Sequence, residues 1–348
     1  RFGRQILHLA TREELGWPPE RADLRPFYDV DDHSILELEP PDHTRIRGLI
    51  QKAFMARQIE RLRGRIETLT HQLIDEMEEV GQANLLDKFA TTIPVFVIAE
   101  LLGVPTNNTD DLLNWSHAMV GMYELGRSAE QEQKAVQAAQ EFVAYIRDFV
   151  EFRRKSPQDD LISKLIAVEE SGEKLTENEL ISTCILLLNA GHEATVNVVG
   201  NGVYALLNHR DQLDLWRQDA SVGKTAVEEL LRYDTPLHLF NRWVLEDVEY
   251  KGHQFPFGSQ VALLLGAANR DPKTFNKPNQ LNLQRERNKH VSFGGGIHFC
   301  IGAPLARLEL QTALPILLNR LPNLELVEEP VYKNSYHFHA LESLIVSW

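Results

Sequence analysis

The segment from Thr176 to Leu207 constrains the fold of this chain more than any other part of the sequence. Thr176 followed by Glu179 has the spacing of a capping box, in which two side chains bond the free N–H groups at the start of a helix. The residues that follow are apolar around most of the circumference that a helix would have. Because such a helix must be covered on nearly all sides, the segment predicts a long buried helix through the middle of the protein.

The remaining pattern predicts a mainly helical fold with a small β portion. Helical periodicity dominates from Asp42 to about Tyr233, and a further helix is expected from about Pro304 to Leu321. Between them lie short β-rich pieces, at Trp243–Tyr250, Gln254–Pro256 and Gln260–Leu265. Residues in the tail Tyr336–Trp348 alternate in the way that strands do, which predicts a hairpin there. Since the sequence shows no repeat and no linker, residues 1–348 are expected to form a single domain.

Composition and charge exclude several classes of protein. Hydrophobic residues make up 43% and charged residues 25% of the chain, as in a globular protein with a sizeable core. The net charge of −14 should repel nucleic acid and anionic membranes. No run reaches the 18 or so apolar residues of a spanning helix, and no secretory signal is visible, so no membrane anchor is expected and the cytoplasm is the expected location. The two cysteines, Cys184 and Cys300, have unlike surroundings, which argues against a disulfide framework or a zinc cluster.

One of these cysteines lies in the segment richest in chemistry, Phe293-Gly-Gly-Gly-Ile-His-Phe-Cys300-Ile-Gly302-Ala-Pro304. Glycine lets backbone N–H groups turn toward a sulfur atom and lets a flat ligand approach closely. A helix beginning near Pro304 would favour the thiolate form of Cys300 through its dipole. An ordinary glycine turn around a buried thiol is the alternative for a lone motif of this kind, but the full pattern Phe-x-x-Gly-x-x-x-Cys-x-Gly is much more specific.

With this motif the sequence resembles the cytochrome P-450 family, the haem-thiolate monooxygenases, and in particular its soluble bacterial members. The resemblance implies a domain that holds haem b between the long helix and the cysteine loop, with the thiolate of Cys300 as the axial iron ligand. A thiolate donates electron density to iron and favours cleavage of the O–O bond. It also implies an oxidoreductase that inserts one oxygen atom from O2 into a lipophilic organic substrate, with electrons from NAD(P)H delivered by a ferredoxin or flavodoxin-type donor and its reductase.

The resemblance assigns further residues to the haem and its surroundings. Four side chains are expected to grip the haem propionates, namely His43, Arg47, Arg242 and His298. Phe293 matches the aromatic residue that shields the sulfur, and Gly302 completes the cysteine motif. Glu229-Leu-Leu-Arg232 places a carboxylate and a guanidinium three residues apart, and with Arg285 these residues match the family's buried Glu-Arg-Arg network. Taken alone, such an i,i+3 pair is usually an exposed surface pair.

The long segment carries a second signature, Ala190-Gly191-His192-Glu193-Ala194-Thr195. In the family a glycine here opens the helix over the iron, and an acid followed by a threonine delivers protons to the oxygen site. Gly191 and Glu193 match, but the threonine position holds Ala194, and Thr195 lies about 100° further around the helix. Thr195 or ordered water could replace the missing hydroxyl, a substrate hydroxyl could complete the relay, or the enzyme could leak peroxide. Because Glu193 is kept in an apolar helix, we expect a relay assisted by water or substrate.

A basic segment offers a docking surface for the electron donor. Between His43 and Ile66 seven cationic residues face one acidic residue, Glu60, which gives +6 in a chain of net −14; they are Arg45, Arg47, Lys52, Arg57, Arg61, Arg63 and Arg65. Such a reversal of charge can steer an acidic carrier. In the family this region borders the haem face where the donor docks, although a solvated helix face is the ordinary interpretation of such a charge run.

The substrate and the class of reaction leave more alternatives open. By resemblance the substrate pocket includes Ala190, Leu237, His238, Asn241 and Phe338, which are mostly apolar with two polar groups. A peroxide-driven peroxygenase is the main alternative function, and a haem gas sensor or carrier is a weaker one. The chain opens at Arg-Phe-Gly-Arg, which resembles the middle of the family's second helical segment, so the family's N-terminal segment is expected to be missing.

Overall fold

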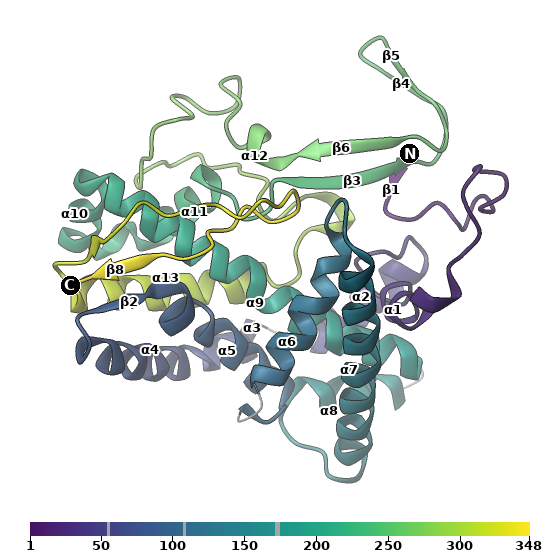
Figure 1. Ribbon diagram of the computed structural model, residues 1–348, viewed down its shortest axis with the longest axis horizontal. Coiled ribbons are helices and arrows are strands. Elements are labelled where there is room, and N and C mark those ends of the chain that lie inside the picture. Colours follow the sequence, from purple (N-terminus) through teal and green to yellow (C-terminus); the bar gives the residue numbers. More distant parts are fainter. Residues whose placement is uncertain (54–55, 107–108, 171–174) are drawn as a thin grey trace. The chain divides into compact units, whose positions relative to one another are not determined.

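A computed structural model describes residues 1–53, 56–106, 109–170 and 175–348 of the chain. The polypeptide forms two compact units, each assembled from three separate stretches of sequence. The first unit comprises Arg1–Ala53, Asp110–Asn189 and Leu239–Leu263. The second comprises Phe54–Thr109, Ala190–His238 and Leu264–Trp348. Helices dominate and strands are few and short, as expected (Figure 1). The expectation of a single domain stays a prediction.

The first unit is built mainly from helices with one small sheet and a hairpin. Its helical elements are α1 (Arg25–Asp31), α2 (Asp42–Ala53), α6 (Thr109–Val120), α7 (Ala129–Lys155), α8 (Leu161–Glu170) and two single 3₁₀ turns, Ala22–Leu24 and Gly121–Tyr123. Its strands are β1 (Phe2–Gly3), β3 (Leu239–Val244), β4 (Val248–Tyr250), β5 (His253–Phe255) and β6 (Gln260–Leu264). The sheet has the order β1-β3-β6, and β4 pairs with β5 as an antiparallel hairpin.

The second unit contains the cysteine loop. Its helical elements are α3 (Ala56–Arg61), α4 (Arg63–Glu78), the π-helical turn η2 (Leu86–Ala90), α5 (Thr92–Leu102), α10 (Arg210–Gln218), the 3₁₀ turn η5 (Ala220–Val222), α11 (Gly223–Tyr233), α12 (Leu265–Ala268), the 3₁₀ turn η6 (Gly296–His298) and α13 (Ala303–Arg320). Three short strands, β2 (Gln82–Asn84), β7 (Glu325–Leu326) and β8 (Ile345–Ser347), form a sheet in the order β2-β8-β7.

The long helix α9 (Glu177–Asn208) confirms the strongest prediction from the sequence. The Thr176 N–H donates to Glu179 Oε2 over 2.8 Å and the Glu179 N–H donates to Thr176 Oγ1 over 3.3 Å, so the predicted capping box is present. Apolar side chains along the helix are almost fully buried; among them are Leu180, Ile185, Val203 and Leu206. The helix is assigned without interruption through Gly191.

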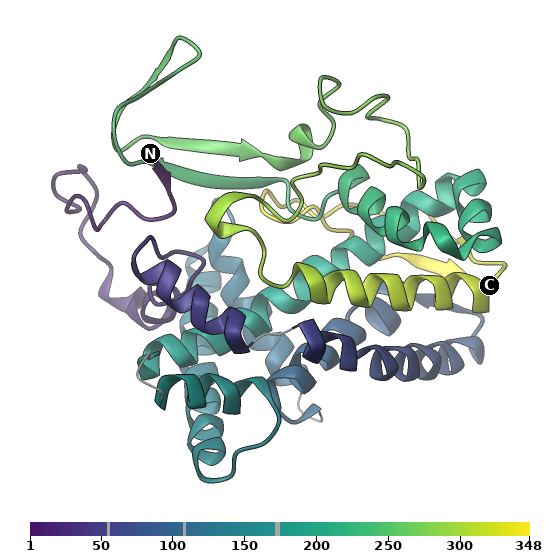
Figure 2. The same ribbon diagram turned by 180° about the vertical axis from the view of Figure 1, so that it is seen from behind.

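Helix α13 begins directly after the cysteine loop. Gly302 is its N-cap and Pro304 occupies its first turn, where a missing N–H costs nothing. The helix packs along α4 in the same unit, as Figure 2 shows. It buries most of its apolar side chains there, so the residues that leave the cysteine loop are anchored to the core of the second unit.

Three predictions about strands are wrong because strand pairing depends on distant residues. The helical half predicted from Asp42 to Tyr233 is broken by β2, which pairs with β8 from the other end of the chain. The tail therefore forms no hairpin with itself; β8 pairs with β2 and β7 instead. The predicted strand Trp243–Tyr250 covers parts of two strands, since β3 ends at Val244 and β4 begins at Val248.

The opening residues are a strand and not part of a helix. Phe2 pairs with Val244 and Gly3 with Trp243 in an antiparallel ladder. A Cβ atom at Gly3 would lie 2.6 Å from the Leu245 side chain and 2.7 Å from that of Glu39, so a larger residue would require these two side chains to shift. The expectation that these residues belong to a helical segment is therefore wrong. Within the described residues no helix is both long and apolar enough to cross a membrane.

Candidate haem site

Cys300 lies in an exposed turn whose backbone is set by glycines. Gly294 and Gly296 have φ angles of 71° and 68°, in the left-handed region that side chains rarely enter. The Cys300 N–H donates to the Phe293 carbonyl over 2.9 Å, which closes the loop. A Cβ atom at Gly302 would sit 3.9 Å from Cys300 Sγ, so the glycine keeps the space beside the sulfur free. The thiol is thus presented on a tightly folded loop.

Both ends of this loop are tied to one carboxylate, that of Glu228 in α11. Before the loop, His290 Nε2 lies 3.0 Å from Glu228 Oε2. After it, Arg307 binds Glu228 in bidentate fashion over 2.7 and 2.8 Å. Burial raises the pKa of Glu228, but its bonds to Arg307 and His290 outweigh this and bring the pKa to about 2. The Arg307 guanidinium also stacks 4.6 Å from the Phe293 ring, so α11 fixes the loop from both sides.

The structure brings Glu229, Arg232 and Arg285 together in a buried network. Arg232 binds Glu229 through two bonds of 2.8 Å, and both side chains are fully buried. Arg285 donates to the same carboxylate over 2.9 Å, and the Asn288 side chain adds a bond of 3.1 Å. The remaining guanidinium N–H groups bind backbone carbonyls of the irregular stretch 269–289; these are Asn269, Asn276, Pro278 and Gln280. The network therefore holds the stretch that leads to the cysteine loop.

The signature residues of α9 are placed in the second unit with Cys300. A Cβ atom at Gly191 would lie 3.0 Å from the Ile98 side chain, so glycine lets α9 and α5 approach closely. This packing accounts for the glycine without an opened helix. Glu193 is half-buried, with its carboxylate 3.9 Å from His192 Nε2. Ala194 is partly exposed whereas Thr195 is buried, as expected for two residues 100° apart on a helix.

A second buried acid, Glu309 of α13, lies against Thr195. Its side chain is only 2% exposed, and neither carboxylate oxygen has a hydrogen-bond partner at normal distance among the described residues. Burial raises the pKa of Glu309 well above its ordinary value, and the Thr195 hydroxyl opposes this only in part. The buried surroundings therefore favour the protonated form of this carboxyl group. The sequence contained a signal for this residue, because Glu309 lies at helical spacing from Leu305 and next to Leu308.

The raised pKa of Glu309 predicts that the protein loses stability as pH rises. An acid whose folded pKa lies above its ordinary value of 4.5 contributes its full stability below that pH, and the contribution is lost as pH rises toward the folded pKa. Glu309→Gln should remove this loss, so its melting temperature should exceed that of the wild type by a margin that grows between pH 5 and pH 9. Glu328→Gln, at an exposed position, is the control. Equal pH slopes for wild type and Glu309→Gln would contradict the assignment.

Three of the expected propionate contacts belong to the first unit. His43 is buried one turn from Arg47 in α2, and burial followed by the Arg47 charge lowers its pKa. Arg242 of β3 donates to the Asn241 carbonyl over 2.8 Å, and burial lowers its pKa against the influence of Glu39. Arg4 also joins this region, because its backbone N–H donates to Glu39 and its guanidinium to the Asn241 carbonyl over 3.3 Å. His298 belongs to the second unit.

The residues expected to line a substrate pocket fall into different surroundings. Leu237 and Phe338 form an antiparallel bridge in the second unit. His238 directly follows Leu237, and whether these residues line a substrate pocket stays a prediction. The His238 ring stacks on His339 at 4.0 Å between centroids. Ala190 is exposed in the second unit, and the side chain of Asn241 is partly buried in the first.

The donor set of the second unit fits a thiolate-bound haem. Cys184, the other cysteine, is fully buried in α9, and burial raises the pKa of its thiol to about 12. Cys300 is exposed, and the Arg307 guanidinium lies near enough for the cysteine to raise its pKa, after the larger effect of Glu228. One accessible sulfur on a glycine-bordered loop, with open space beside Gly295 and Gly296, suits a flat ligand that takes a single thiolate.

Several supporting residues were missed by the sequence analysis. Glu228 directly precedes Glu229, which alone was assigned a role from the sequence. The partners of Glu228, His290 and Arg307, are about 60 and 80 residues away. Asn269 was not singled out from the sequence, yet its side chain binds the Val291 N–H over 2.8 Å and Ser292 Oγ over 2.9 Å. Only the distance in sequence concealed these contacts, because each residue is polar and stands in an apolar setting.

Comparisons with known proteins agree on one family. The family description "Cytochrome P450" matches residues 14–338. The polyketide biosynthesis cytochrome P-450 PksS of Bacillus subtilis is 45% identical over 100% of this chain and 84% of its own length. The 6-deoxyerythronolide B hydroxylase of Saccharopolyspora erythraea is 41% identical over 95% of this chain and 80% of its own. The crystal structure of P-450 BioI in complex with an acyl carrier protein bearing hexadec-9Z-enoic acid superimposes with a TM-score of 0.91 at 38% identity, covering 95% of this chain and 85% of that one.

Proposed function

We propose, from the premise that the chain belongs to the cytochrome P-450 family, that this haem-thiolate monooxygenase inserts one oxygen atom from O2 into a lipophilic small organic substrate. We further propose that its electrons come from NAD(P)H through a ferredoxin or flavodoxin-type donor and its reductase. The observation that carries the proposal is the presentation of Cys300 as an exposed thiol on a loop braced from both ends by Glu228.

We assign Cys300 as the axial ligand of the haem iron. The roles of the other site residues are assigned one by one. When bound, the haem supplies activation of dioxygen at a thiolate-ligated iron. His43, Arg47, Arg242 and His298 are assigned to the haem carboxylates, which their cationic or hydrogen-bonding groups suit. Phe293 covers the sulfur and is itself held by the Arg307 guanidinium. The rigid attachment of the loop to α11 keeps the thiolate in one position.

Proton supply is assigned to Glu193 and to the pair of Thr195 and Glu309. Glu193 is half-buried in α9 and can exchange protons with water. Burial raises the pKa of Glu309 and so favours its protonated form, and the hydroxyl that touches it is that of Thr195. Since Thr195 is turned toward α13, the space at Ala194 is left for water or a substrate hydroxyl. This supports a relay assisted by water or substrate over a leak of peroxide.

Ala194→Thr is expected to raise the amount of product formed per NAD(P)H consumed, by several-fold, and to lower the peroxide released. A positioned proton donor contributes roughly 10²–10⁴-fold to a rate, and the added hydroxyl supplies part of this where the relay depends on water. The control is Val196→Thr, two residues along the same helix. If Ala194→Thr leaves both coupling and product profile unchanged, the assisted relay is wrong.

Exposed cations of the basic segment support the proposed electron donor. Lys52 ends α2 and Arg61 ends α3, and both side chains are exposed. Arg63 is paired with Glu60 over 2.6 Å and Arg65 with Glu100 over 3.0 Å, which reduces their charge toward a partner. Arg45 binds Glu179 over 2.6 Å. The side chain of Arg57 lies outside the described part of the structure, and Lys52 and Arg61 are chosen for the test because both are exposed.

Lys52→Glu and Arg61→Glu are each expected to slow electron transfer several-fold at low ionic strength. Steering between opposite charges is screened within about 10 Å at 0.1 M salt, so the difference from wild type should shrink as salt is added. The measurement is the stopped-flow rate of haem reduction by a reduced acidic ferredoxin. Lys333→Glu, an exposed lysine outside the segment, is the control. Rates that match the control at every salt concentration would reject the docking surface.

The substrate class is proposed from the relatives. PksS is named for polyketide biosynthesis, and the BioI structure contains a hexadecenoyl chain carried by an acyl carrier protein. Long acyl-derived chains are therefore the lipophilic molecules to try first. A shift of the iron from low to high spin on addition of such a compound would mark a substrate, and turnover with peroxide alone would favour a peroxygenase instead.

A further inference from the structure

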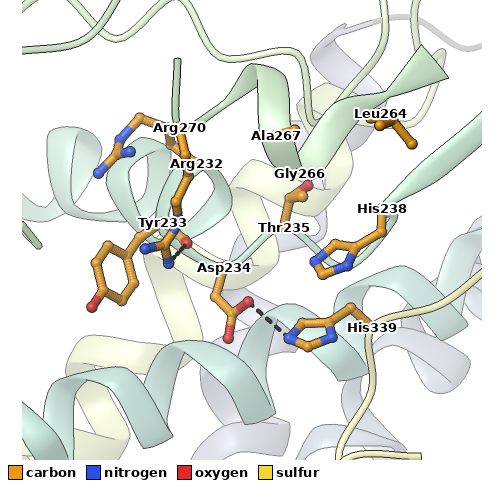
Figure 3. Close-up of a pocket in the computed structure, with 10 residues that line it drawn as sticks. All are labelled: Arg232, Tyr233, Asp234, Thr235, His238, Leu264, Gly266, Ala267, Arg270 and His339. Atoms are coloured by element: carbon orange, nitrogen blue, oxygen red, sulfur yellow. Dashed lines mark hydrogen bonds and ion pairs between the residues drawn. The ribbon is translucent and has the colours of Figure 1, made fainter. Parts of the chain in front are cut away.

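A pocket of about 410 Å³ lies in the second unit. It is bordered by the residues that follow α11, by the start of α12 and by the C-terminal segment around His339 (Figure 3). Its wall carries one carboxylate and two imidazoles, from Asp234, His238 and His339. Apart from His238, which was expected to line the substrate pocket, none of the residues bordering it was given a role at the haem or the substrate.

The three side chains are held in a defined arrangement. Asp234 Oδ1 lies 3.1 Å from His339 Nε2, the ion pair drawn in Figure 3. The other carboxylate oxygen, Oδ2, accepts a bond of 2.8 Å from the Tyr332 hydroxyl. The His339 ring lies between Tyr332 and His238, stacked at 4.1 and 4.0 Å between centroids. The carboxylate and one imidazole are thus oriented by neighbours, as outer groups orient ligands in metal sites.

The distances among these groups are close to those around a metal ion. One ligand atom from each of the three residues lies within 4.8 Å of the others. Some point is then within about 2.8 Å of all three, which exceeds the 2.0–2.2 Å of a zinc bond by less than 1 Å. We propose that Asp234, His238 and His339 bind one divalent transition-metal ion, with water from the pocket completing its coordination.

Binding requires one ring to turn. The two imidazole planes are 15° apart, so their nitrogen lone pairs run nearly parallel and do not converge on one point. His339 is fixed by Asp234 and Tyr332, whereas His238 borders the open pocket and can rotate into it.

The charges that face the site partly balance. Arg270 lines the pocket and disfavours a cation, but its guanidinium is engaged by the Tyr233 carbonyl, by Asn279 Oδ1 at 3.3 Å and by stacking on the Tyr233 ring. Asp234 supplies the opposing negative charge. Two imidazoles and one carboxylate are ligands that suit zinc, copper, nickel or iron(II) and not magnesium or calcium.

A bound ion would join two segments that already touch. The His339 N–H donates to the Pro236 carbonyl over 2.9 Å, and Leu237 bridges to Phe338. A metal held by Asp234, His238 and His339 would link these same segments through side chains. Because Leu237 and Phe338 are expected to line the substrate pocket, the ion would stiffen that wall from behind.

Calorimetric titration of the haem-loaded protein with Zn²⁺ in excess Mg²⁺ tests the site. Loading with haem removes Cys300 as a competing zinc ligand. The expected result is one zinc ion per chain, with affinity lowered at least about tenfold in His238→Gln and in Asp234→Asn. His253→Gln, an exposed histidine in β5, should bind as the wild type does. Tyr332→Phe, which keeps the stacked ring but loses the bond to Asp234, should fall between them.

The outcome is decisive even if one variant folds badly. His238 contributes a stacked ring, so His238→Gln should keep the haem spectrum of the wild type and carries the decision if Asp234→Asn does not fold. The proposal is overturned if the wild-type protein shows no saturable zinc binding. So does zinc binding that is equally strong in His238→Gln and His253→Gln, since the ion would then lie elsewhere. Neither result bears on the monooxygenase assignment.

Discussion

Replacing Cys300 by Ser is expected to reduce substrate oxidation by about two orders of magnitude or more while leaving the fold intact. A serine hydroxyl stays protonated and cannot supply the electron density that a thiolate gives to iron. Cys300 lies in an exposed turn closed by its own backbone bond to Phe293, which the substitution keeps. The loss should therefore come from ligation and not from unfolding.

The measurement is turnover with a reconstituted electron donor, alongside haem content and melting temperature. Cys184→Ala is the matched control, because that thiol is fully buried in α9 and has no expected role at the iron. Its activity per bound haem should equal that of the wild type. If Cys300→Ser retained wild-type turnover, or if Cys184→Ala lost it, Cys300 would not be the axial ligand.

Glu229→Gln is expected to lower the free energy of unfolding by about 3–5 kcal/mol, the usual result of removing one partner from a buried ion pair. Glu229 and Arg232 are both fully buried, and Arg285 is only 10% exposed. The amide would leave two guanidinium groups without their counter-charge in the core. Since whole proteins are stable by only about 5–15 kcal/mol, much of the variant should be recovered without haem.

An exposed pair of the same spacing makes the control. Glu60 and Arg63 are also three residues apart and lie 2.6 Å from one another, but both are well exposed. Glu60→Gln should change stability by no more than about 0.5 kcal/mol, because solvent screens such pairs. Urea denaturation followed by tryptophan fluorescence compares the two. A loss below about 1 kcal/mol in Glu229→Gln would show that the network is not needed for the fold.

Local signals in the sequence predicted the helices well. The capping box of Thr176 and Glu179 marked the start of α9 because both bonds are made within one turn. Pro304 marked the first turn of α13 for the same local reason. The pair Glu229 and Arg232 could also be expected to meet, since residues three apart share one face of a helix. What the sequence could not show was that this face is buried.

Contacts between distant residues were beyond such reasoning. The strand β2 pairs with β8, more than 250 residues later, and no local pattern encodes that partner. Asp234 and His339 meet only because Leu237 bridges to Phe338. The stacking of His238 on His339 could not be expected from the sequence either, because the two residues are 101 positions apart, and the role of His238 in the substrate pocket stays a prediction. Pairing of this kind is set by tertiary structure and not by the residues near each strand.

The visible spectrum of the reduced, carbon-monoxide-bound protein tests the central claim most directly, when it is recorded for this chain and for Cys300→Ser. We predict a strongly red-shifted Soret band for the chain as given and its loss in the variant, which would establish thiolate ligation by Cys300. A band at the shorter wavelength of histidine-bound or displaced haem in the unaltered chain, or a red-shifted band that persists in Cys300→Ser, would contradict the account.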